Sequence, residues 1–474
     1  MVAPTPHLRS PIGRRRFLAG ALAAAVLPAV APPARAEGAG VRVALVARER
    51  PRLLPGCAAP SLLWTYGEDW PLALRVARGA PFAATLRNEL ADHTTVHWHG
   101  VRVPFAMDGV PWVTQPPVLP GESFTYRFAP PDPGTFFFHP HCNTMEALGR
   151  GLAGVLVVED PRDAGRFDVD RVVALKDWRV RADGAFDAFS TDTGAARAGT
   201  FGDLRTANGR RVPEIAVAPG DRVRLRIVNL DPTRAPLLDF GPVPAMVIAT
   251  DGNACTPFRA TGWRLGPAMR ADVAFVAPPR GTVTLADGWA AAPVPLARIV
   301  VAGAPAAASR APLALPPAEL PVPDLRRAET LEMALLAGSS DPDIEKWARE
   351  TGMSADALCL SRRIFWSINR RAWPGQGHER LPPPLAELKR GRSYVLELFN
   401  GTPHIHPMHL HGHTFRVLGT AGRTVPPHWA DTVLVEPKER MRIAFVAGEP
   451  GDWMFHCHII EHQESGMMGY LRVS

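Results

Sequence analysis

Short runs of apolar residues that alternate with polar ones recur along most of the chain. Residues 222–228, for example, place Val223, Leu225 and Ile227 between arginines, and a period of two is typical of a β-strand with one buried face. The 474 residues include 50 prolines and 41 glycines, which favours short strands joined by turns over long helices. The pattern predicts an all-β protein built from sandwiches, with one short helical segment over residues 342–358 that leads into the last part of the chain.

One sequence unit occurs three times. Residues 78–88, 219–229 and 390–400 each contain a glycine turn, a strand and a closing asparagine. Nine residues beyond that asparagine, the three copies read His97-Trp98-His99, Leu238-Asp239-Phe240 and His409-Leu410-His411. Self-similarity of this kind predicts three domains of one fold, of which the middle one lacks the histidines.

A second repeat links the first and third copies. Residues 133–141 and 450–458 both hold Pro-Gly, an aromatic strand and a His-x-His ending, whereas the matching stretch near 279–281 has no histidine. We expect domains over residues 38–160, 161–305 and 325–474, with a Pro/Ala-rich linker over residues 306–324.

Residues 1–36 have the pattern of a twin-arginine signal peptide. Arg14, Arg15 and Arg16 precede an apolar run that begins at Phe17, and an Ala-x-Ala cleavage site ends at Ala36. The alternative is a membrane anchor, but the apolar run is shorter than the ~20 residues that span a bilayer. We expect export by the twin-arginine machinery, a periplasmic or secreted protein, and no stable membrane insertion.

The basic charge belongs largely to this leader. The whole chain carries a formal net charge of +7, and residues 1–36 hold five arginines and no acidic residue, so the mature chain carries +2. This small charge argues against a nucleic-acid partner. An odd count of five cysteines in an exported chain indicates that one thiol, most simply Cys457, serves something other than a disulfide. The pairing of Cys57, Cys142, Cys255 and Cys359 stays open.

The histidines predict a metal centre. In a strand, residues i and i+2 face the same side, so a His-x-His pair presents two imidazoles together. Eight imidazoles buried for structural reasons alone would be costly, at ~1–3 kcal/mol for each unsatisfied polar group. A multinuclear site fits them if the first and third domains meet face to face. The four pairs are His97/His99, His139/His141, His409/His411 and His456/His458.

The stretch around Cys457 predicts a second, mononuclear site. In an extended segment Cys457 faces away from His456 and His458. Cys457, His462 and Met467 supply three of the four ligands of a blue-copper site, and His406, just before the third-domain pair, is the candidate for the fourth. The first-domain repeat has Thr94, Pro140 and Met145 where the third domain has His406, Cys457 and His462, so only the third domain can build this site.

These motifs resemble those of multicopper oxidases of the laccase type over nearly the whole mature chain. The resemblance implies three cupredoxin-like Greek-key β-sandwich domains and an enzyme with four copper ions. It implies that single electrons pass from a reducing substrate at a type 1 copper to a trinuclear cluster, where dioxygen becomes water. The implied ligands are His406, Cys457, His462 and Met467 for type 1; His97 and His409 for type 2; and His99, His139, His141, His411, His456 and His458 for the type 3 pair.

Oxygen reduction also needs protons. Asp108 matches an acid that relatives place near the type 2 copper, and we expect it to be a proton donor; the alternative is a turn aspartate before Gly109. Several bacterial relatives carry Glu directly after the second type 1 histidine, where this chain has Gln463. Gln463 cannot donate a carboxyl proton, so Glu461 and Glu464 are the further candidates.

Three other functions fit the motifs less well. A copper-free cupredoxin scaffold would lack ligands, whereas every ligand position here is filled. A periplasmic cuprous or ferrous ion oxidase is the main alternative, but residues 325–440 hold only Met333, Met353 and Met408 rather than a Met-rich insertion. A two-domain nitrite reductase does not fit the third domain. The favoured reductants are phenols and aromatic amines, with dioxygen as the second substrate.

Overall fold

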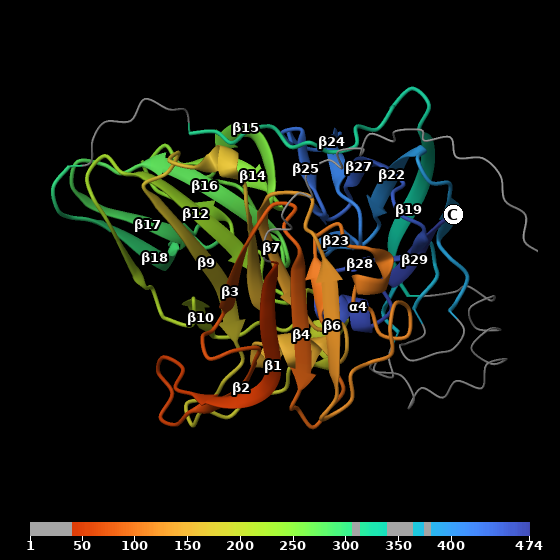
Figure 1. Cartoon of the computed structure of the whole chain (residues 1–474), viewed down its shortest axis with the longest axis horizontal. Helices are drawn as coiled ribbons and strands as arrows, with labels where there is room; N and C mark the ends of the chain where they lie inside the picture. The colour runs from red at the N-terminus through yellow and green to blue at the C-terminus, as the bar shows by residue number, and fades with distance from the viewer. Residues whose placement is uncertain (1–39, 306–312, 339–363, 374–380) are drawn as a thin grey trace, which may run out of the picture. The chain divides into compact units, whose positions relative to one another are not determined.

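The strands of the described residues form six sheets, which the chain builds as three successive pairs (Figure 1). The computed structural model describes residues 40–305, 313–338, 364–373 and 381–474. The predicted leader and the predicted helical segment lie outside the described residues, as do Cys359 and the first part of the predicted linker. Residues Ala39–Ser474 form one compact unit.

The first sheet pair draws on residues 41–159. One sheet has the order β2 (Ser61–Thr65), β1 (Val41–Arg52), β4 (Phe82–Asn88), β6 (Ser123–Phe128). The other has the order β3 (Leu72–Ala77), β8 (Gly154–Glu159), β7 (Gly134–His139), β5 (His97–His99). A short helix α1 (Thr144–Arg150) and the 3-10 turns η1 (Phe105–Met107) and η2 (Pro161–Asp163) join its strands or follow them.

The middle sheet pair draws on residues 169–301. Its larger sheet has the order β10 (Leu204–Ala207), β9 (Val169–Trp178), β12 (Arg222–Asn229), β16 (Arg270–Val276), β14 (Met246–Thr250), β15 (Asn253–Arg259). Its smaller sheet has the order β11 (Glu214–Val217), β18 (Val294–Val301), β17 (Gly281–Asp287), β13 (Leu238–Asp239). The short helix α2 (Asp192–Ala195) precedes β10.

The third sheet pair draws on residues 329–473. One sheet has the order β20 (Trp366–Ile368), β19 (Glu329–Ala337), β22 (Ser393–Asn400), β27 (Arg440–Val446), β24 (Phe415–Thr420), β25 (His428–Ala430). The other has the order β21 (Ala386–Leu388), β29 (Met468–Val473), β28 (Gly451–Cys457), β23 (His406–Leu410), β26 (Thr432–Val435). A one-turn helix, α4 (Ile460–Glu464), joins β28 to β29. No described strand is shared between pairs, and the domain boundaries stay a prediction.

The asparagine that closes each sequence repeat has the same task three times. Asn88, Asn229 and Asn400 end β4, β12 and β22, and each side chain donates to two or more carbonyl oxygens that lie beyond the strand. In the third copy one of these acceptors is the main-chain oxygen of His404, at 2.6 Å. The repeat thus fixes the loop that leads into β23, where the third-domain histidines begin.

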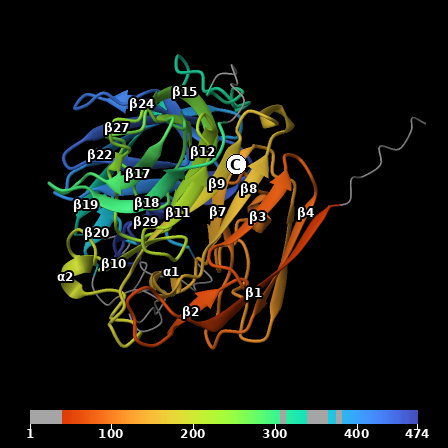
Figure 2. The ribbon, with the colours of Figure 1, turned by 90° about the vertical axis from the view of Figure 1, so that its left-hand side faces the viewer.

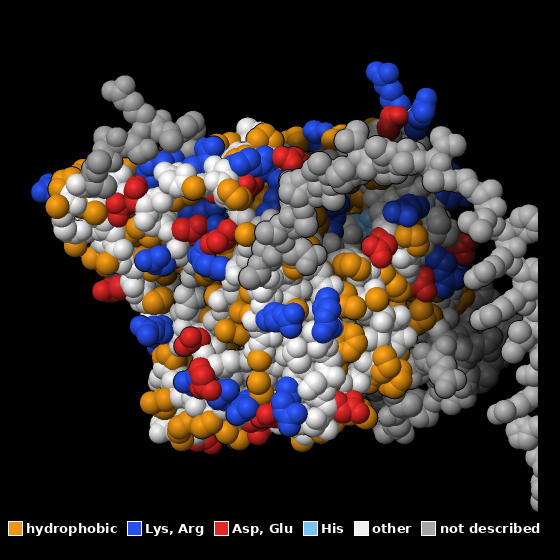
Figure 3. All heavy atoms as spheres, in the orientation of Figure 1, with side chains coloured by type: hydrophobic (Ala, Val, Ile, Leu, Met, Phe, Trp, Pro, Cys, Tyr) orange, Lys and Arg blue, Asp and Glu red, His pale blue; other side chains and the backbone are white. Residues whose placement is uncertain are grey.

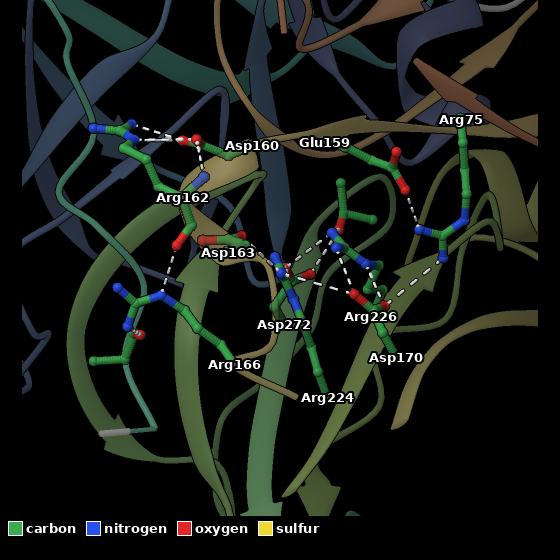
Figure 4. A network of polar contacts seen from close by, with 12 residues as sticks. Arg75, Glu159, Asp160, Arg162, Asp163, Arg166, Asp170, Arg224, Arg226 and Asp272 are labelled. Carbon is green, nitrogen blue, oxygen red and sulfur yellow. Dashed lines mark hydrogen bonds and ion pairs between the residues drawn. The ribbon is translucent and has the colours of Figure 1, made fainter. Parts of the chain in front are cut away.

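Residues 222–228 differ from the expectation of a strand with one face in solvent. All of β12 is buried, including Arg222, Arg224 and Arg226. The arginine face lies against the first sheet pair, where Arg226 donates to the Thr135 hydroxyl of β7 at 2.9 Å, and Figure 4 shows its ion pairs with Asp170 and Asp272. Paired charges therefore replace solvent on this face, and Figure 2 shows β7 beside β12.

Each sheet pair encloses its own apolar core, and the core of the third pair contains Cys457 and Met467. In the view of Figure 3, basic and acidic side chains are interspersed over the surface, in keeping with the small net charge of the mature chain. Among the described residues, no helix has the length and apolar character needed to cross a membrane.

Candidate metal centre

Eight buried histidines meet between the first and third sheet pairs. β5 and β7 place His97 opposite His139, and across the boundary the ring centroids of His99 and His409 lie 3.6 Å apart. The structure therefore brings the four predicted pairs into one cluster. Its members are His97, His99, His139, His141, His409, His411, His456 and His458.

Unprotonated nitrogens face each other inside this cluster. The Nδ1 atom of His411 donates to Asp108 Oδ2 at 2.8 Å, and the Nδ1 atom of His456 donates to the main-chain oxygen of Cys457 at 3.0 Å. In neutral imidazoles the proton then sits on Nδ1, so the two Nε2 lone pairs, which are 3.0 Å apart, point at one another. Two facing acceptors are unfavourable unless a cation lies between them, which is the arrangement that a metal ion requires.

One further pair of histidines, His139 and His458, has facing Nε2 atoms. His139 donates from Nδ1 to Pro140 O, and its Nε2 lies 3.4 Å from Nε2 of His458. The His99 ring has the opposite orientation: its Nε2 atom, rather than its Nδ1 atom, contacts a supporting oxygen, Asp431 Oδ1, at 3.1 Å. Within the described part of the chain, the inner nitrogens of several of these rings have no hydrogen-bond partner, namely His97 Nε2, His99 Nδ1, His409 Nε2, and both nitrogens of His141.

Electrostatics keeps these rings neutral. Burial, with a further contribution from neighbouring imidazoles, lowers the pKa of seven of the eight histidines below the ordinary value. The neutral imidazole is the form that binds metal. The seven are His99, His139, His141, His409, His411, His456 and His458.

Sets of three donor atoms lie close enough to share one ion. In each set all ligand atoms are within 4.8 Å of one another. Three sets consist of histidines only and together include seven of the eight rings. They are His97/His409/His411, His97/His99/His139 and His141/His411/His456.

A separate thiol and imidazole site lies inside the third sheet pair. Cys457 Sγ is 3.6 Å from His406 Nδ1 and 3.7 Å from His462 Nδ1, and these two nitrogens are 3.1 Å apart. The outer Nε2 atoms carry the protons, since they bond to Thr402 Oγ1 at 2.8 Å and to Arg197 O at 2.6 Å. Burial raises the pKa of the Cys457 thiol above its ordinary value, so a thiolate here needs a cation beside it.

Met467 is tied to the same site through its backbone. Its main-chain oxygen accepts from the Cys457 N–H at 3.0 Å, and its N–H donates to His462 O at 2.9 Å. Gly466 makes this return possible, because it has a φ of 114° and a Cβ there would collide with the main-chain oxygen of Trp366. One tight turn after α4 thus returns the chain to the cysteine.

Asp108 lies directly behind the histidine cluster and contacts both sides of it. Besides its bond to His411, its main-chain oxygen accepts from His97 Nδ1 at 2.9 Å, and its side chain is 1% exposed. Gly109, with a φ of 78°, lies very close to Val96. A Cβ on residue 109 would collide with the main-chain oxygen of Val96, so the position requires glycine. Asp108 therefore does more than occupy a turn before glycine.

Glu461 points away from the histidine cluster, toward the middle sheet pair. Its carboxylate accepts from the N–H of Thr191 at 3.2 Å and from the hydroxyl and N–H of Thr200, and it lies 3.6 Å from Arg179 Nη2. These contacts use both oxygens. They support a structural role for Glu461.

Glu464 and Gln463 lie at the end of α4. Glu464 accepts from the Met145 N–H of α1 at 2.9 Å, and burial raises the pKa of its carboxyl to about 8. Gln463 is buried, and neither polar atom of its amide has a hydrogen-bond partner among the described residues. The sequence shows that residue 463 has no carboxyl group, but it gives no sign that the Gln463 amide is buried without a hydrogen-bond partner among the described residues.

Sequence analysis missed the residues that support the cluster from the middle sheet pair. Arg270 and Asp251 come from the domain that has no histidine ligands, yet they reach Asp431, which contacts His99 and His409. A buried arginine or aspartate in a strand gives no signal in a single sequence. His428, which is not one of the predicted ligands, is also buried, since it is 5% exposed and packs on Trp263.

A pocket of about 380 Å³ lies between the middle and third sheet pairs, and its lining includes the two residues that precede His406 in the chain. His404 and Ile405 form part of its wall, and Phe201 and Trp289 present exposed aromatic rings, 46% and 63% accessible. Sequence analysis did not find this pocket, because its walls come from loops of two domains.

Comparison with known proteins decides the family. Models described as multicopper oxidase match residues 50–163 and 363–474. The crystal structure of a multi-copper oxidase from Pseudomonas thermotolerans is 36% identical, superimposes with a TM-score of 0.81, and covers 92% of this chain and 100% of that one. The chain belongs to the multicopper oxidase family.

Two further relatives are similar over most of their length. The multicopper oxidase MmcO of Mycobacterium tuberculosis is 29% identical over 508 residues, which is 96% of this chain and 95% of the relative. A multicopper oxidase of Campylobacter jejuni, described as a metallo-oxidase, is 26% identical with a TM-score of 0.73 and covers 91% of both chains. The present chain is therefore an oxidoreductase that uses oxygen. Its predicted cupredoxin-like three-domain fold is confirmed.

Family membership implies copper, and the donor set fits it. Nitrogens of neutral imidazoles and one buried thiol suit copper better than a hard cation such as calcium. The facing Nε2 atoms of His411 and His456, and the facing Nδ1 atoms of His406 and His462, are the donor pairs that fit a cation most plainly.

Proposed function

We propose that this multicopper oxidase takes single electrons from a small organic reductant, such as a phenol or an aromatic amine, and reduces dioxygen to water. The observation that carries the proposal is the arrangement around Cys457. Its thiol lies among the Nδ1 atoms of His406 and His462, while His456 on the same strand has its ring in the histidine cluster. The polypeptide itself thus connects an electron-entry site with an oxygen site.

Four copper ions are proposed. His406, Cys457, His462 and Met467 would hold the type 1 ion; His97 and His409 the type 2 ion; and His99, His139, His141, His411, His456 and His458 the type 3 pair. Copper bound there would supply the one-electron redox chemistry that matches four single-electron oxidations to the four-electron reduction of dioxygen.

The residues around the type 1 ligands restrict how a reductant approaches. Residues 191–200 of the middle domain, here called the covering loop, place Arg197 O on His462 Nε2 and Ala195 O on Trp366 Nε1, both at 2.6 Å. His462 is 0% exposed, so a substrate cannot touch its edge. The proposed approach for a reductant is the pocket that His404 and Ile405 line. Trp366 packs on the rings of both His404 and His462, with its ring centroid 5.9 Å from that of His404 and 4.6 Å from that of His462.

The lining of that pocket favours an organic reductant over a metal ion. Its two acidic residues are already paired, Asp287 with Arg205 at 2.9 Å and Glu436 with Arg264 in a bidentate contact at 2.9 and 3.0 Å. As far as the described chain lines the pocket, no methionine or cysteine contributes. Exposed Phe201 and Trp289 instead offer flat apolar surfaces to an aromatic ring.

The proton for oxygen reduction is proposed to come through Asp108, whose Oδ2 is bonded to His411. Glu464 is a second candidate. Glu461 is not, because its oxygens bind the covering loop and Arg179.

The alternative is a cuprous or ferrous ion oxidase, and one specific observation favours it, since the Campylobacter jejuni relative is described as a metallo-oxidase. The two functions are separated by measuring oxygen uptake with a phenol, with ferrous ion and with cuprous ion on the same preparation. A rate of oxygen uptake with phenol that exceeds the rates with both metal ions supports the proposal. Oxygen uptake with the metal ions alone establishes the alternative.

The preparation must first show that the protein is an active copper enzyme. We expect about four coppers per chain and a blue absorption band. A protein that cannot be loaded beyond one copper, or that stays colourless, would be a scaffold and not an oxidase.

Export is proposed from residues 1–36. If the twin-arginine signal is cleaved after Ala36, the mature protein begins at Glu37. N-terminal sequencing of protein from the periplasm or medium tests this, together with export of a variant in which Arg14, Arg15 and Arg16 are changed to lysine.

A further inference from the structure

Arg270 joins all three sheet pairs at one buried point. It begins β16 of the middle pair, and its side chain is 0% exposed. Its Nε donates to Thr135 O of the first pair at 3.2 Å, and its Nη1 donates to Asp431 Oδ1 of the third pair at 2.8 Å and to Ala268 O at 2.9 Å. Its Nη2 binds the other oxygen of Asp431. The guanidinium is therefore held in one orientation by acceptors on every side.

Asp431, which Arg270 holds in place, contacts two histidines of the cluster. Its Oδ1 lies 3.1 Å from Nε2 of His99, and its main-chain oxygen accepts from Nδ1 of His409 at 2.8 Å. Thr432 completes the contact, because its hydroxyl donates to Asp431 Oδ1 at 2.8 Å and lies 3.0 Å from His99 Nε2. These bonds leave Nδ1 of His99 and Nε2 of His409 as the atoms that face the metal site.

Two more residues pack closely against the Arg270–Asp431 ion pair. Asp251 of the middle domain accepts from the N–H of Asp431 and of Thr432 at 3.2 and 3.0 Å and from the N–H of Arg270 at 2.8 Å. Gly100, which ends the first histidine motif, has a φ of 81°, and a Cβ there would collide with Asp431 and Arg270. The glycine after His99 is thus required by the Arg270–Asp431 pair as well as by its own backbone.

We propose that Arg270 is a positioning residue for the trinuclear centre, through which the middle domain sets the orientation of His99 and His409. The proposal rests on the proposed function, because it takes these histidines as type 3 and type 2 ligands. Partners behind a ligating imidazole fix its tautomer and ring orientation. Only arginine matches both oxygens of a carboxylate while a third nitrogen binds elsewhere, so lysine cannot replace it without losing contacts.

The opposing explanation is that Arg270 merely fastens the three sheet pairs together. In that case its loss would lower stability but leave the metal centre unchanged. Arg224 provides the comparison, because it is also buried and lies on the neighbouring strand β12. Its ion pairs are with Asp163, Asp170 and the buried Asp272 (Figure 4), rather than with Asp431.

The test compares Arg270→Lys with Arg224→Lys in the full-length, copper-loaded protein. Each variant is measured for copper content at a series of free copper concentrations, for the type 1 and type 2 signals in electron paramagnetic resonance, and for thermal unfolding of the copper-free form. We expect Arg270→Lys to bind copper at the trinuclear centre about 10–100-fold more weakly and to change the type 2 signal. The blue type 1 signal should be unchanged, because the described contacts of Arg270 do not include the type 1 ligands.

Arg224→Lys should lower the unfolding temperature of the copper-free protein to a similar degree and keep both copper signals as in the parent. If Arg270→Lys cannot be purified folded, Asp431→Asn, which keeps the shape of the carboxylate but loses an acceptor oxygen, takes its place with the same expectation. A parental copper affinity and type 2 signal in the folded variant would overturn the proposal. Failure of the proposed function is distinguishable, because the parent protein itself would then lack the four coppers.

Discussion

Asp108 accepts a hydrogen bond from His411 at 2.8 Å, so a carboxylate of the first domain is held against a histidine of the third. We expect Asp108→Asn to lower kcat for oxygen reduction by at least about 100-fold, the lower end of what a positioned acid contributes, while copper content stays near the parent. Steady-state oxygen uptake and metal analysis measure the two effects. Asp132→Asn is the control, because Asp132 is also buried but is paired with Arg102; equal rates for both variants would remove Asp108 from the proton path.

The proposed electron route between the type 1 site and the histidine cluster depends on the sulfur atom of Cys457. We expect Cys457→Ser to abolish the blue absorption and turnover, because a hydroxyl does not provide the soft ligand that binds copper beside His406 and His462. The fold should persist, since serine is smaller than cysteine and the site is enclosed by the core of the third sheet pair. Circular dichroism and the type 2 resonance signal check this. Oxidation of a phenol at the parent rate would refute the electron route.

Much of this architecture could be predicted from the sequence, because the ligands repeat at fixed spacings. The His-x-His pairs and Cys457 occupy strands whose two-residue period fixes which side chains share a face. Arg270, Asp431 and Asp251 could not be found in this way, since the contacts of Arg270 and Asp251 with Asp431 join residues more than a hundred positions apart. Glu461 shows the same limit. Its place beside His462 suggested chemistry, but its partners come from the covering loop of another domain.

The pocket that His404 and Ile405 line makes a prediction about substrate class. Trp289 is 63% exposed at its wall, and the Arg264 guanidinium lies 4.1 Å above the ring. Trp289→Ala should raise KM for a phenol by about 2–10-fold, as expected from an aromatic contact of about 0.5–1.5 kcal/mol, and should leave kcat and ferrous ion turnover unchanged. Trp112→Ala is the control, because Trp112 is also exposed but is not part of the pocket lining. Equal effects on phenol and ferrous ion would contradict the organic-reductant proposal.

Glu461 distinguishes a structural contact from a proton relay. We expect Glu461→Gln to destabilise the copper-loaded protein by about 2 kcal/mol, because hydrogen bonds to a charged group contribute about 1.5–3 kcal/mol each and the amide keeps part of them. Thermal and urea unfolding measure this loss, and kcat should change less than threefold. The opposite result, unchanged stability with a hundredfold lower kcat, would restore Glu461 as a proton donor.

His428 predicts how part of the stability depends on pH. Its Nδ1 donates to Pro426 O at 2.6 Å, and burial lowers its pKa from 6.5 to about 4. The unfolded chain therefore takes up a proton at a higher pH than the folded protein does. The stability associated with neutral His428 is fully present above pH 6.5 and is lost as the pH falls toward 4.

The loss from this one group is about 3 kcal/mol, at 1.36 kcal/mol for each unit of pKa difference. His428→Asn keeps a donor near Pro426 but removes the titration, so the variant should be less stable than the parent at pH 7 and the gap should narrow by about 3 kcal/mol at pH 4. Urea unfolding of both proteins at pH 7, 5.5 and 4 measures the gap. A gap that stays constant over this range would show that His428 is protonated in the folded protein as readily as in the unfolded chain, and that its burial does not govern its charge.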